Sequence, residues 1–581
     1  MQIISVDETK CIGCNKCVRV CPVHEANITK LKPGSTDEFV TNVREDKCIN
    51  CGECVKSCKH GARVYVDNSD QFFRDIKDKT EMAIIVAPSI RTALPGNAWG
   101  NMLNYFRNTG NVRVYDVAYG ADICTWGHYK MIKDNRITKC ISQPCPAIVN
   151  YIEKYKPTLL RSLSPVQSPA SCLAIYLKKY IGLDMPIYLL SPCIAKTNEA
   201  QRENTFDYNV TFQSLMSYFD GRGINLEADM GTDFKFDLAP GILGQLYPRP
   251  GGLRDNLAAL NPDLIIRTSE GPHSVYRRLD RYAKIDDVMR PDVLDVLNCE
   301  FGCNMGTATV DNLNLADVEG TMDKLEIAAQ KERGMLLGKD KRYKEFDHKL
   351  NVDDFLCTYV DRFIKDKYPS VTEIDSIFNS MLKETPETRE INCTSCGYES
   401  CYDMCVAIYK GLNIKENCVY YMKYQIKQSY QNICVLYKTL QQESTALADI
   451  IKGILDSKKI ISDDADSVIV NAEKTVVLLD KLKEILDNFS GYFHDISVDT
   501  VSETDLENVE AITDKIQTIL LSYKDSVLND IEVGNKIKST VSELSEHTDN
   551  LNQLVSGVTS RLSTLSNQYQ NRISGKDEDQ K

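Results

Sequence analysis

The sequence predicts a multidomain protein of mixed α+β and α/β class that ends in a long α-helical tail. Its 581 residues are too many for one hydrophobic core, so several domains are expected. Short apolar runs alternate with helical patterns between residues 80 and 300, which is typical of an α/β domain. Residues 420–575 contain no proline and few glycines, which favours continuous helix.

We expect five segments along the chain. They are a cysteine-rich domain at 1–78, an α/β domain at 79–375, a small cysteine-rich domain at 385–425, a helical coiled-coil region at 426–570 and a disordered polar tail at 571–581. The net charge of −13 argues against a nucleic-acid partner, which would need a basic face. The start of the chain lacks a signal-peptide pattern, and no apolar run approaches the ~20 residues of a membrane span, so we expect a cytoplasmic protein without membrane contact.

Eight of the 22 cysteines fall before residue 60, in two runs with the spacing C-x2-C-x2-C-x3-C. In a long chain of a reducing compartment, such clustering indicates metal ligation rather than disulfides. In two-cluster ferredoxins the fourth cysteine of each run ligates the other cluster. We therefore assign one 4Fe–4S cluster to Cys11, Cys14, Cys17 and Cys58, and a second to Cys48, Cys51, Cys54 and Cys21. Zinc is the alternative metal that such cysteine runs could bind.

A third cysteine group has the spacing C-x2-C-x4-C-x16-C and consists of Cys393, Cys396, Cys401 and Cys418. A helix over 402–410 and a turn at Gly411 would return the last cysteine to the first three. The group resembles a small 4Fe–4S domain of anaerobic redox proteins, and zinc again remains the alternative.

In the middle domain, apolar runs predict strands at 82–86, 112–117, 138–143, 187–190, 264–267 and 293–297. Helical patterns occupy 147–155 and 171–180, and charged helical patterns follow at 316–327 and 352–365. Alternation of strand and helix predicts parallel sheets with covered faces.

Four further cysteines follow the ends of predicted strands: Cys145, Cys193, Cys299 and Cys303. Ligands in open α/β sheets collect at the carboxyl edge, so we expect these four to converge on one iron–sulfur cluster. The alternative for the closely spaced last two is a pair of buried thiols.

The segments around these cysteines, at 142–146, 191–199 and 299–306, resemble the three loop motifs of the iron–iron hydrogenase family, and the resemblance covers about residues 1–365. It implies two α/β lobes with the active cluster between them. Cys145, Cys193, Cys299 and Cys303 would hold a 4Fe–4S unit, and Cys303 would bridge to a diiron centre with CO, cyanide and dithiolate ligands. Lys196 would hydrogen-bond a cyanide, and Glu199 could pair with it at i, i+3.

The resemblance also implies dihydrogen as substrate, a redox partner such as ferredoxin, and dependence on hydrogenase maturation proteins. The chain departs from the family at four places. Pro144 stands where fast hydrogenases have a proton-transferring cysteine, and Ser191 and Leu297 replace methionines. The segment 123–129 lacks the family's proton-transferring glutamates; His128 or Cys124 could replace them, and the alternative is a core histidine and a buried thiol. Proton transfer by a positioned group is worth roughly 10²–10⁴-fold, so we expect slow turnover.

In the last part of the tail, apolar residues recur with alternating steps of four and three. They are Ile537, Val541, Leu544, Thr548, Leu551, Val555, Val558, Leu562, Leu565 and Tyr569. This heptad predicts a coiled coil and a homodimer, with an amphipathic helix in a bundle as the alternative.

A long helical tail is needed for signalling rather than for catalysis. The sequence therefore favours a slow, sensory iron–iron hydrogenase from an anaerobe, whose tail reports hydrogen or redox state to a signalling partner that the sequence does not name. Two alternatives stay open: an electron-transfer or scaffold protein with 4Fe–4S clusters only, and a slow metabolic hydrogenase.

Overall fold

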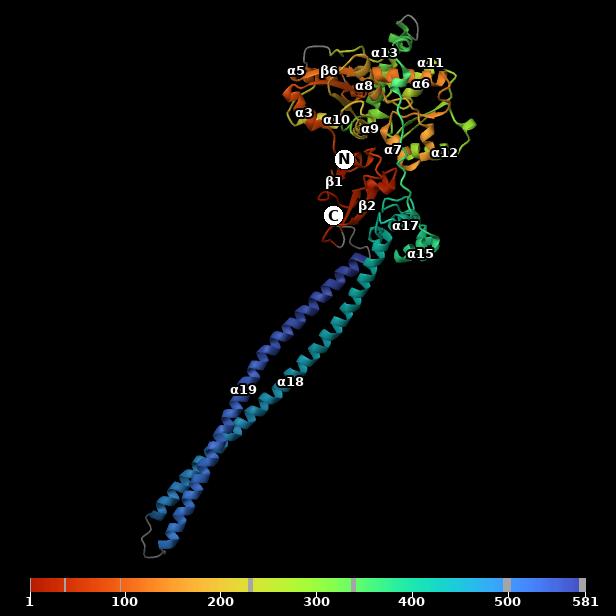
Figure 1. Ribbon diagram of the computed structural model, residues 1–581. Helices are drawn as coiled ribbons and strands as arrows, with labels where there is room; N and C mark the ends of the chain where they lie inside the picture. Colours follow the sequence, from red (N-terminus) through yellow and green to blue (C-terminus); the bar gives the residue numbers. More distant parts are fainter. Residues whose placement is uncertain are drawn as a thin grey trace. The chain divides into compact units, whose positions relative to one another are not determined.

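The structure is a computed structural model. It describes residues 2–35, 38–94, 96–227, 234–335, 341–494 and 503–573. The chain forms two compact units, Met1–Lys423 and Tyr424–Lys581 (Figure 1).

The first unit begins with a small domain of two antiparallel strand pairs. β1 (Ile4–Val6) pairs with β4 (Arg63–Tyr65), and β2 (Asn27–Leu31) pairs with β3 (Phe39–Val43). Each of the two N-terminal cysteine motifs enters a short helix, α1 (Lys16–Arg19) and α2 (Glu53–Lys56). The domain is therefore an internal repeat of one cysteine motif with one helix.

The larger of two parallel sheets has the strand order β6-β5-β8-β9. Its strands are β5 (Glu81–Val86), β6 (Asn111–Asp116), β8 (Ile187–Ser191) and β9 (Tyr208–Thr211). Side chains of β5 alternate between two cores, with Ile85 on one face and Ile84 on the other. One core includes α6 (Val117–Lys133) and α8 (Pro169–Ile175); the other includes α3 (Ser69–Asp78), α4 (Ile90–Ala93), α5 (Ala98–Thr109) and α10 (Phe212–Asp220). Both faces are covered, which explains the continuous apolar strands.

The second parallel sheet has the order β10-β11-β7. Its strands are β7 (Cys140–Ile141), β10 (Ile266–Glu270) and β11 (Val293–Leu297). A core on one face joins α7 (Pro146–Tyr155) and α12 (Pro272–Tyr282) to residues of the N-terminal domain such as Ile49. The other helices of this region are α9 (Lys196–Glu203), α11 (Gly252–Leu260), α13 (Leu315–Met335) and α14 (Lys341–Lys349).

The strands lie near the predicted apolar runs, with differences in extent. Only Cys140–Ile141 of the run 138–143 is a strand, and β10 begins at Ile266 rather than 264. β9 was not predicted, because its four residues include a buried asparagine, Asn209, and give no apolar run. Its place in the sheet comes from pairing with β8.

The helix predicted at 352–365 is wrong. A single short turn, Val352–Phe355, is followed by chain without helix. Arg362 and the backbone N–H of Val360 both donate to the buried carboxylate of Glu153 in α7. These two donors pair the buried charge of Glu153. The stabilisation from this pairing exceeds what helix propensity would contribute in a charged segment.

A small helical domain completes the first unit, with α15 (Val371–Ser380), α16 (Pro386–Arg389) and α17 (Cys401–Tyr409). Each helix begins with a capping box, at Ser370, Thr385 and Ser400 respectively. In such a box the side chains of the cap and of the third helical residue satisfy free N–H groups reciprocally. The predicted helix at 402–410 is thereby confirmed as α17.

The second unit is an antiparallel helical hairpin. It consists of α18 (Val419–His494), whose first turn belongs to the first unit, and α19 (Glu503–Ile573) (Figure 1). Cross-helix contacts keep one register from end to end: Ser444 with Thr559, Lys458 with Ser545, Lys538 with Asp466, Lys524 with Asp480 and Gln517 with Asp487. In the segment that we expected to be disordered, 571–573 end α19 and 574–581 lie outside the described residues. Among the described helices, none combines the length and hydropathy of a membrane span.

Candidate active site and metal centres

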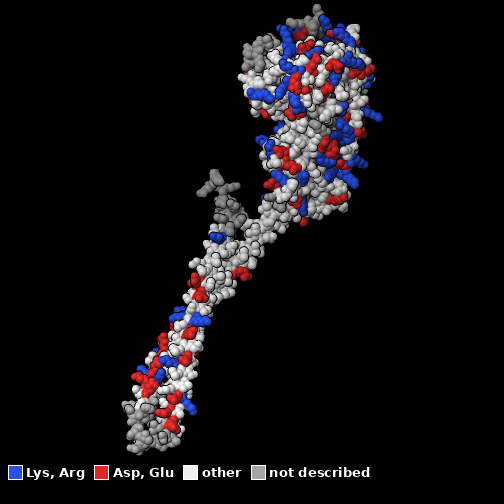
Figure 2. Space-filling view, turned by 60° about the vertical axis from the view of Figure 1, so that its left-hand side comes forward, with Lys and Arg blue, Asp and Glu red and all other residues white. Residues whose placement is uncertain are grey.

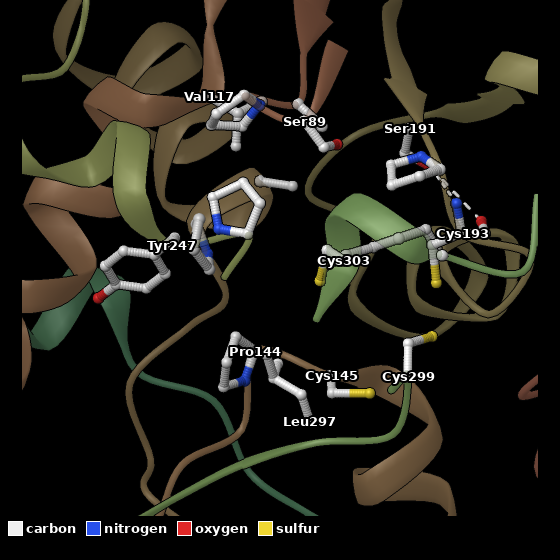
Figure 3. A pocket seen from close by; sticks show the side chains of 18 of the residues that line it. Ser89, Val117, Pro144, Cys145, Ser191, Cys193, Tyr247, Leu297, Cys299 and Cys303 are labelled. Carbon is white, nitrogen blue, oxygen red and sulfur yellow. Dashed lines mark hydrogen bonds between the residues drawn. The ribbon is translucent and has the colours of Figure 1, made fainter. Parts of the chain in front are cut away.

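The four cysteines that follow strands in the α/β domain line one cavity. Cys145 caps α7 after β7, Cys193 follows β8, and Cys299 and Cys303 lie in the loop after β11. Figure 3 shows their sulfur atoms facing a common space. The strands come from both sheets, so the cavity lies where the carboxyl edges of the two sheets meet.

The loop between Cys299 and Cys303 depends on one glycine. Gly302 has φ 76°, and a Cβ there would lie 2.2 Å from the carbonyl oxygen of Pro248. The Cys303 N–H donates to that same oxygen at 2.7 Å. Glycine is the residue that allows this conformation and this close approach, which place Cys303 on the cavity wall.

Burial sets the protonation of these thiols. It raises the pKa of Cys193 to about 12, and the neighbouring Cys145 thiolate adds to the rise while Lys196 opposes it. Burial and the neighbouring thiolates likewise raise the pKa of Cys299 and Cys303. Thiols this far above their usual pKa stay protonated near neutral pH, so a cation must displace the protons to make thiolate ligands. Four convergent cysteines form the donor set that suits an iron–sulfur cubane.

Lys196 begins α9 and lines the same cavity. Its Nζ donates to Glu199 Oε2 at 2.6 Å and to Ser168 Oγ at 3.2 Å. The i, i+3 pair that the sequence suggested is therefore confirmed. Glu199 is buried and also accepts from Ser168. The carboxylate holds a cation at the cavity wall, where an anionic ligand would need one.

Sequence reasoning missed two polar residues of the cavity. Ser89 follows β5, and its buried Oγ has no hydrogen-bond partner among the described residues. The signal available was a serine three residues after the apolar run 82–86. Tyr247 lines the opposite part of the cavity, beside Pro144, and its hydroxyl lies 2.8 Å from Thr125 Oγ1 (Figure 3).

Behind Tyr247, α6 carries a buried pair of titratable residues. Cys124 Sγ lies 3.7 Å from His128 Nδ1. Burial opposes ionisation of this thiol, but hydrogen bonding to Cys172 and the nearby imidazole outweigh it and lower the pKa of Cys124 to about 5. The Tyr247 hydroxyl is close enough to the Cys124 thiol for the two groups to interact electrostatically. Cys124, His128 and Tyr247 thus form a group of titratable side chains of which Tyr247 lines the cavity.

The eight N-terminal cysteines separate into the two expected sets. Cys11, Cys14, Cys17 and Cys58 line one cavity. The other four lie close together, because thiols of this set act on the pKa of their neighbours. Cys48 raises the pKa of Cys21, Cys21 and Cys54 raise that of Cys51, and Cys21 and Cys48 raise that of Cys54. Arg63 lies between the sets and donates from Nη2 to Cys17 Sγ at 3.1 Å.

The second N-terminal set lies next to the central cavity. The amide of Asn298, which precedes Cys299, donates to Glu53 Oε1 at 3.2 Å and accepts from the Tyr276 hydroxyl at 2.6 Å. Burial raises the pKa of Tyr276, and Cys51 and Cys299 both add to the rise. Tyr276 is thus close enough to interact with thiols of both sets.

The third group, Cys393, Cys396, Cys401 and Cys418, lines a small cavity of its own. This domain packs against the first N-terminal motif: Asn15 donates to Asn417 Oδ1 at 2.8 Å, and Arg19 donates to the Thr394 carbonyl at 2.9 Å. Among the described residues, no group of three or more His, Cys, Asp or Glu side chains is spaced to hold a single metal ion.

Two family profiles match the chain. Residues 80–264 match "Iron only hydrogenase large subunit, C-terminal domain", and residues 10–62 match "4Fe-4S dicluster domain". The first match contains Cys145, Cys193 and Lys196, whereas Cys299 and Cys303 lie beyond its end.

Curated relatives point the same way. The chain is 32% identical over 225 residues to the periplasmic Fe hydrogenase large subunit of Nitratidesulfovibrio vulgaris, covering 35% of this chain and 52% of that protein. It is 28% identical to iron hydrogenase 1 of Clostridium pasteurianum, covering 34% of this chain and 39% of that protein. It is 29% identical over 119 residues to the cytosolic Fe-S cluster assembly factor nar-1 of Neurospora crassa, covering 19% of this chain and 20% of that protein. The chain thus spans about half the length of the first relative. Because that relative is named periplasmic, the comparison does not support our expectation of a cytoplasmic protein.

Among solved structures, a variant of the FeFe-hydrogenase HydA1 from Chlamydomonas reinhardtii covers 52% of this chain and is itself covered completely, at 16% identity and a TM-score of 0.39. The matches to the hydrogenase and dicluster profiles, in the expected order along the sequence, agree with the motifs around the central cavity. Residues 80–264 of this chain are therefore similar to the C-terminal domain of the iron-only hydrogenase large subunit, and residues 10–62 to a 4Fe-4S dicluster domain.

Proposed function

We propose that this protein is a sensory hydrogenase, which cleaves dihydrogen slowly and reports the outcome through its helical tail. The observation that carries the proposal is the convergence of Cys145, Cys193, Cys299 and Cys303 on one cavity with Lys196 at its wall. In this proposal the four cysteines hold a 4Fe–4S unit, and Cys303 also bridges to a diiron centre with CO, cyanide and dithiolate ligands. That centre supplies heterolytic cleavage of dihydrogen when bound.

The chain's own residues prepare the site for this chemistry. Lys196, held by Glu199, presents a compact cation to a buried anionic ligand, and Ser89 presents a hydroxyl without a partner among the described residues. Pro144 contributes no proton carrier. Tyr247 lines the cavity and the Cys124–His128 pair lies behind it, and we assign these groups the slower proton route.

The proposed electron route follows the order of the cysteine sets. The central cavity lies beside the set that contains Cys51, and the first N-terminal motif contacts the Cys393–Cys418 domain through Asn15 and Asn417. Cys418 directly precedes α18. Lys383 lines this last site, donates to the Thr388 carbonyl at 2.6 Å and lies 4.3 Å from the ring centre of Tyr420 in the first turn of α18. A change of charge at this site would thus act on the base of the tail.

The test uses full-length protein that hydrogenase maturation proteins have loaded under anaerobic conditions. We expect infrared bands of CO and cyanide, sixteen cubane irons plus the diiron centre, and hydrogen oxidation far below the rates of bidirectional hydrogenases. Cys303→Ser should abolish the infrared bands, whereas Cys140→Ser, at a buried cysteine outside the four sets, should keep them. Turnover as fast as that of bidirectional enzymes would exclude the sensory interpretation.

A second candidate function is an electron-transfer or scaffold protein that binds cubanes only. One curated relative is named a Fe-S cluster assembly factor, and Pro144 removes the family's proton carrier. The same infrared experiment separates the two functions. Cubane iron without any CO or cyanide band in a fully matured sample would favour the scaffold.

A further inference from the structure

The contact between the two tail helices combines large apolar side chains with small and polar ones. On α18 the inward positions recur every seven residues in two rows, and they include Ile451, Leu455 and Ile469 as well as Ser444, Lys458, Ala465 and Ala472. The facing rows of α19 include Leu520, Val527 and Ile531 as well as Gly534, Ser545, Thr548 and Thr559. Two inward rows on each helix are what a two-helix hairpin needs, so any further apolar row requires another explanation.

A third row of large apolar side chains lines one flank of each helix, one position before an inward row. On α18 this apolar flank consists of Ile433, Leu440, Leu447, Ile454, Ile461, Val468 and Leu482. On α19 it consists of Ile516, Tyr523, Ile537, Leu544, Leu551 and Val558. Every one of these residues is between 38% and 57% exposed.

This pattern revises the role of the predicted heptad in α19. One of its rows, with Val541, Thr548, Val555 and Leu562, turns toward α18 and is at least half-buried. The other row, with Ile537, Leu544, Leu551 and Val558, stays exposed. The side chains of Leu565 and Tyr569 lie outside those that the structure describes. Among the residues that the structure describes, half of the heptad therefore stays about half exposed rather than packed against α18.

The two apolar flanks lie on the same side of the hairpin. The helices are antiparallel, and positions that directly precede an inward row in an antiparallel pair face the same side. The opposite flank, one position after an inward row, is polar along all of α18: Gln431, Lys438, Thr445, Lys452, Lys459, Asp466, Glu473, Asp480 and Asp487. On α19 the same flank is polar except at Leu521 and Leu528. The hairpin thus has one apolar and one polar side.

The apolar side has the size of a stable interface. Burying one Val, Leu or Ile fully is worth about 1.5–3 kcal/mol at about 25 cal/mol/Å², so a half-exposed side chain presents on the order of 50 Å². The apolar flanks together then present on the order of 600 Å² per chain, and two facing copies would bury about 1,200 Å². Patches of this size are unusual on monomers. In Figure 2 the part of the hairpin built from the beginning of α18 and the end of α19 carries few charged side chains.

The flanks also match one another along their length. Each is interrupted once by a polar residue, Thr475 on α18 and Asp530 on α19. In the register set by the pairs 480–524 and 466–538, these two residues lie at the same level of the hairpin. A second hairpin laid alongside in the same direction would place apolar against apolar and polar against polar at every level. An opposed second hairpin would place the interruption against apolar residues.

We infer that the apolar flanks bind a second copy of this chain and that the two hairpins form a four-helix bundle with a two-fold axis along its length. Three apolar positions per heptad suit a bundle, whereas the two of a coiled coil would leave one row exposed. Closed two-fold symmetry uses the same face of both copies and leaves none of it open. The inference concerns the tail and stands independently of the hydrogen chemistry.

The first experiment measures the mass of the full-length 65.6-kDa chain by analytical ultracentrifugation at micromolar concentration. We expect twice the chain mass. Leu447→Asp together with Leu551→Asp puts charges on the apolar flank and should shift the protein to monomer. The matched control, Thr445→Asp with Ser556→Asp, puts the same charges on the polar flank at nearly the same level and should stay dimeric. A monomeric native chain, or equal loss of dimer in both variants, would overturn the inference.

A second experiment does not depend on a destabilising variant. A photoreactive benzoylphenylalanine at position 447 should cross-link two chains, with the adduct on the partner chain near Val558, which lies at the same level. The same amino acid at position 445 should give no cross-linked dimer. Cross-linked dimer from position 445, or adducts far from Val558 in the partner, would refute the proposed face or the proposed direction of packing.

Discussion

Replacing Arg63 by Met should lower the reduction potential of the N-terminal clusters. The guanidinium is 5% exposed. Its Nη2 lies 3.1 Å from Cys17 Sγ, 2.9 Å from Asn27 Oδ1 and 3.0 Å from the Thr41 carbonyl oxygen. Burial would lower the pKa of Arg63, but thiolates of both sets, Cys54 and Cys17 foremost, raise it above its usual value. One buried cation therefore faces both proposed clusters.

The size of the effect follows from the hydrogen bond. A reduced cluster carries one more negative charge than an oxidised one, so a nearby cation stabilises the reduced form and raises the potential. A hydrogen bond to a charged group is worth ~1.5–3 kcal/mol, and we assign about half of that to the difference between oxidation states. At 59 mV per tenfold change for one electron, Arg63→Met should lower the potential by about 30–65 mV.

The assay is a redox titration of the full-length protein, followed by electron paramagnetic resonance under anaerobic conditions. Arg63→Lys keeps the charge and should shift the potential less than Arg63→Met. Arg44→Met removes a more exposed arginine, paired with Asp46, from the same domain and should leave the potential unchanged. Equal iron content in all variants is required, because Arg63→Met also removes the hydrogen bonds that the guanidinium donates to Asn27 and Thr41. Unchanged potentials in Arg63→Met, or equal shifts in the Lys and Met variants, would refute this role.

Three further predictions concern the central cavity and the tail. Lys196→Met should leave the 4Fe–4S iron in place but reduce or shift the cyanide infrared bands, because the buried cation at the wall is lost; unchanged bands would contradict this assignment. Tyr247→Phe should slow hydrogen turnover by roughly 10²-fold at unchanged infrared bands, and equal turnover would place the proton route elsewhere. Deleting 424–581 should preserve hydrogen turnover, since the remaining unit Met1–Lys423 is compact by itself, and should abolish hydrogen-dependent signalling in cells; signalling that persists would show that the tail is no transmitter.

The repeated cysteine spacings were readable from the sequence because they are local. The runs at 11–21 and 48–58 and the group at 393–418 each place ligands within a few turns of chain, so spacing alone groups most of them. The apolar strands 82–86 and 187–190 were readable for a related reason. Both faces of these strands are covered, so each strand appears as an unbroken apolar run.

The central cavity required the tertiary structure. Cys145, Cys193 and Cys303 are far apart in sequence, and they meet because strands of two sheets, β7 and β11 of one and β8 of the other, end at one place. Tyr247 carries no sequence signal and was found only from its position on the cavity wall, and the position of Ser89 after a strand was a weak signal that the cavity made clear. The same applies to the segment 352–365, where a buried Glu153 outweighs local helix propensity.

The tail shows the division most clearly. A heptad in the sequence indicates that two rows of α19 are apolar, but it does not say what covers each row. Packing against α18 covers the row of Val541 and Val555 and leaves that of Leu544 and Leu551 open. Periodicity is a property of one helix and can be read along the chain, whereas the partner of a face depends on a segment 30 to 115 residues away. Local order is therefore encoded in neighbouring residues, and the choice of contact is made only when distant residues meet.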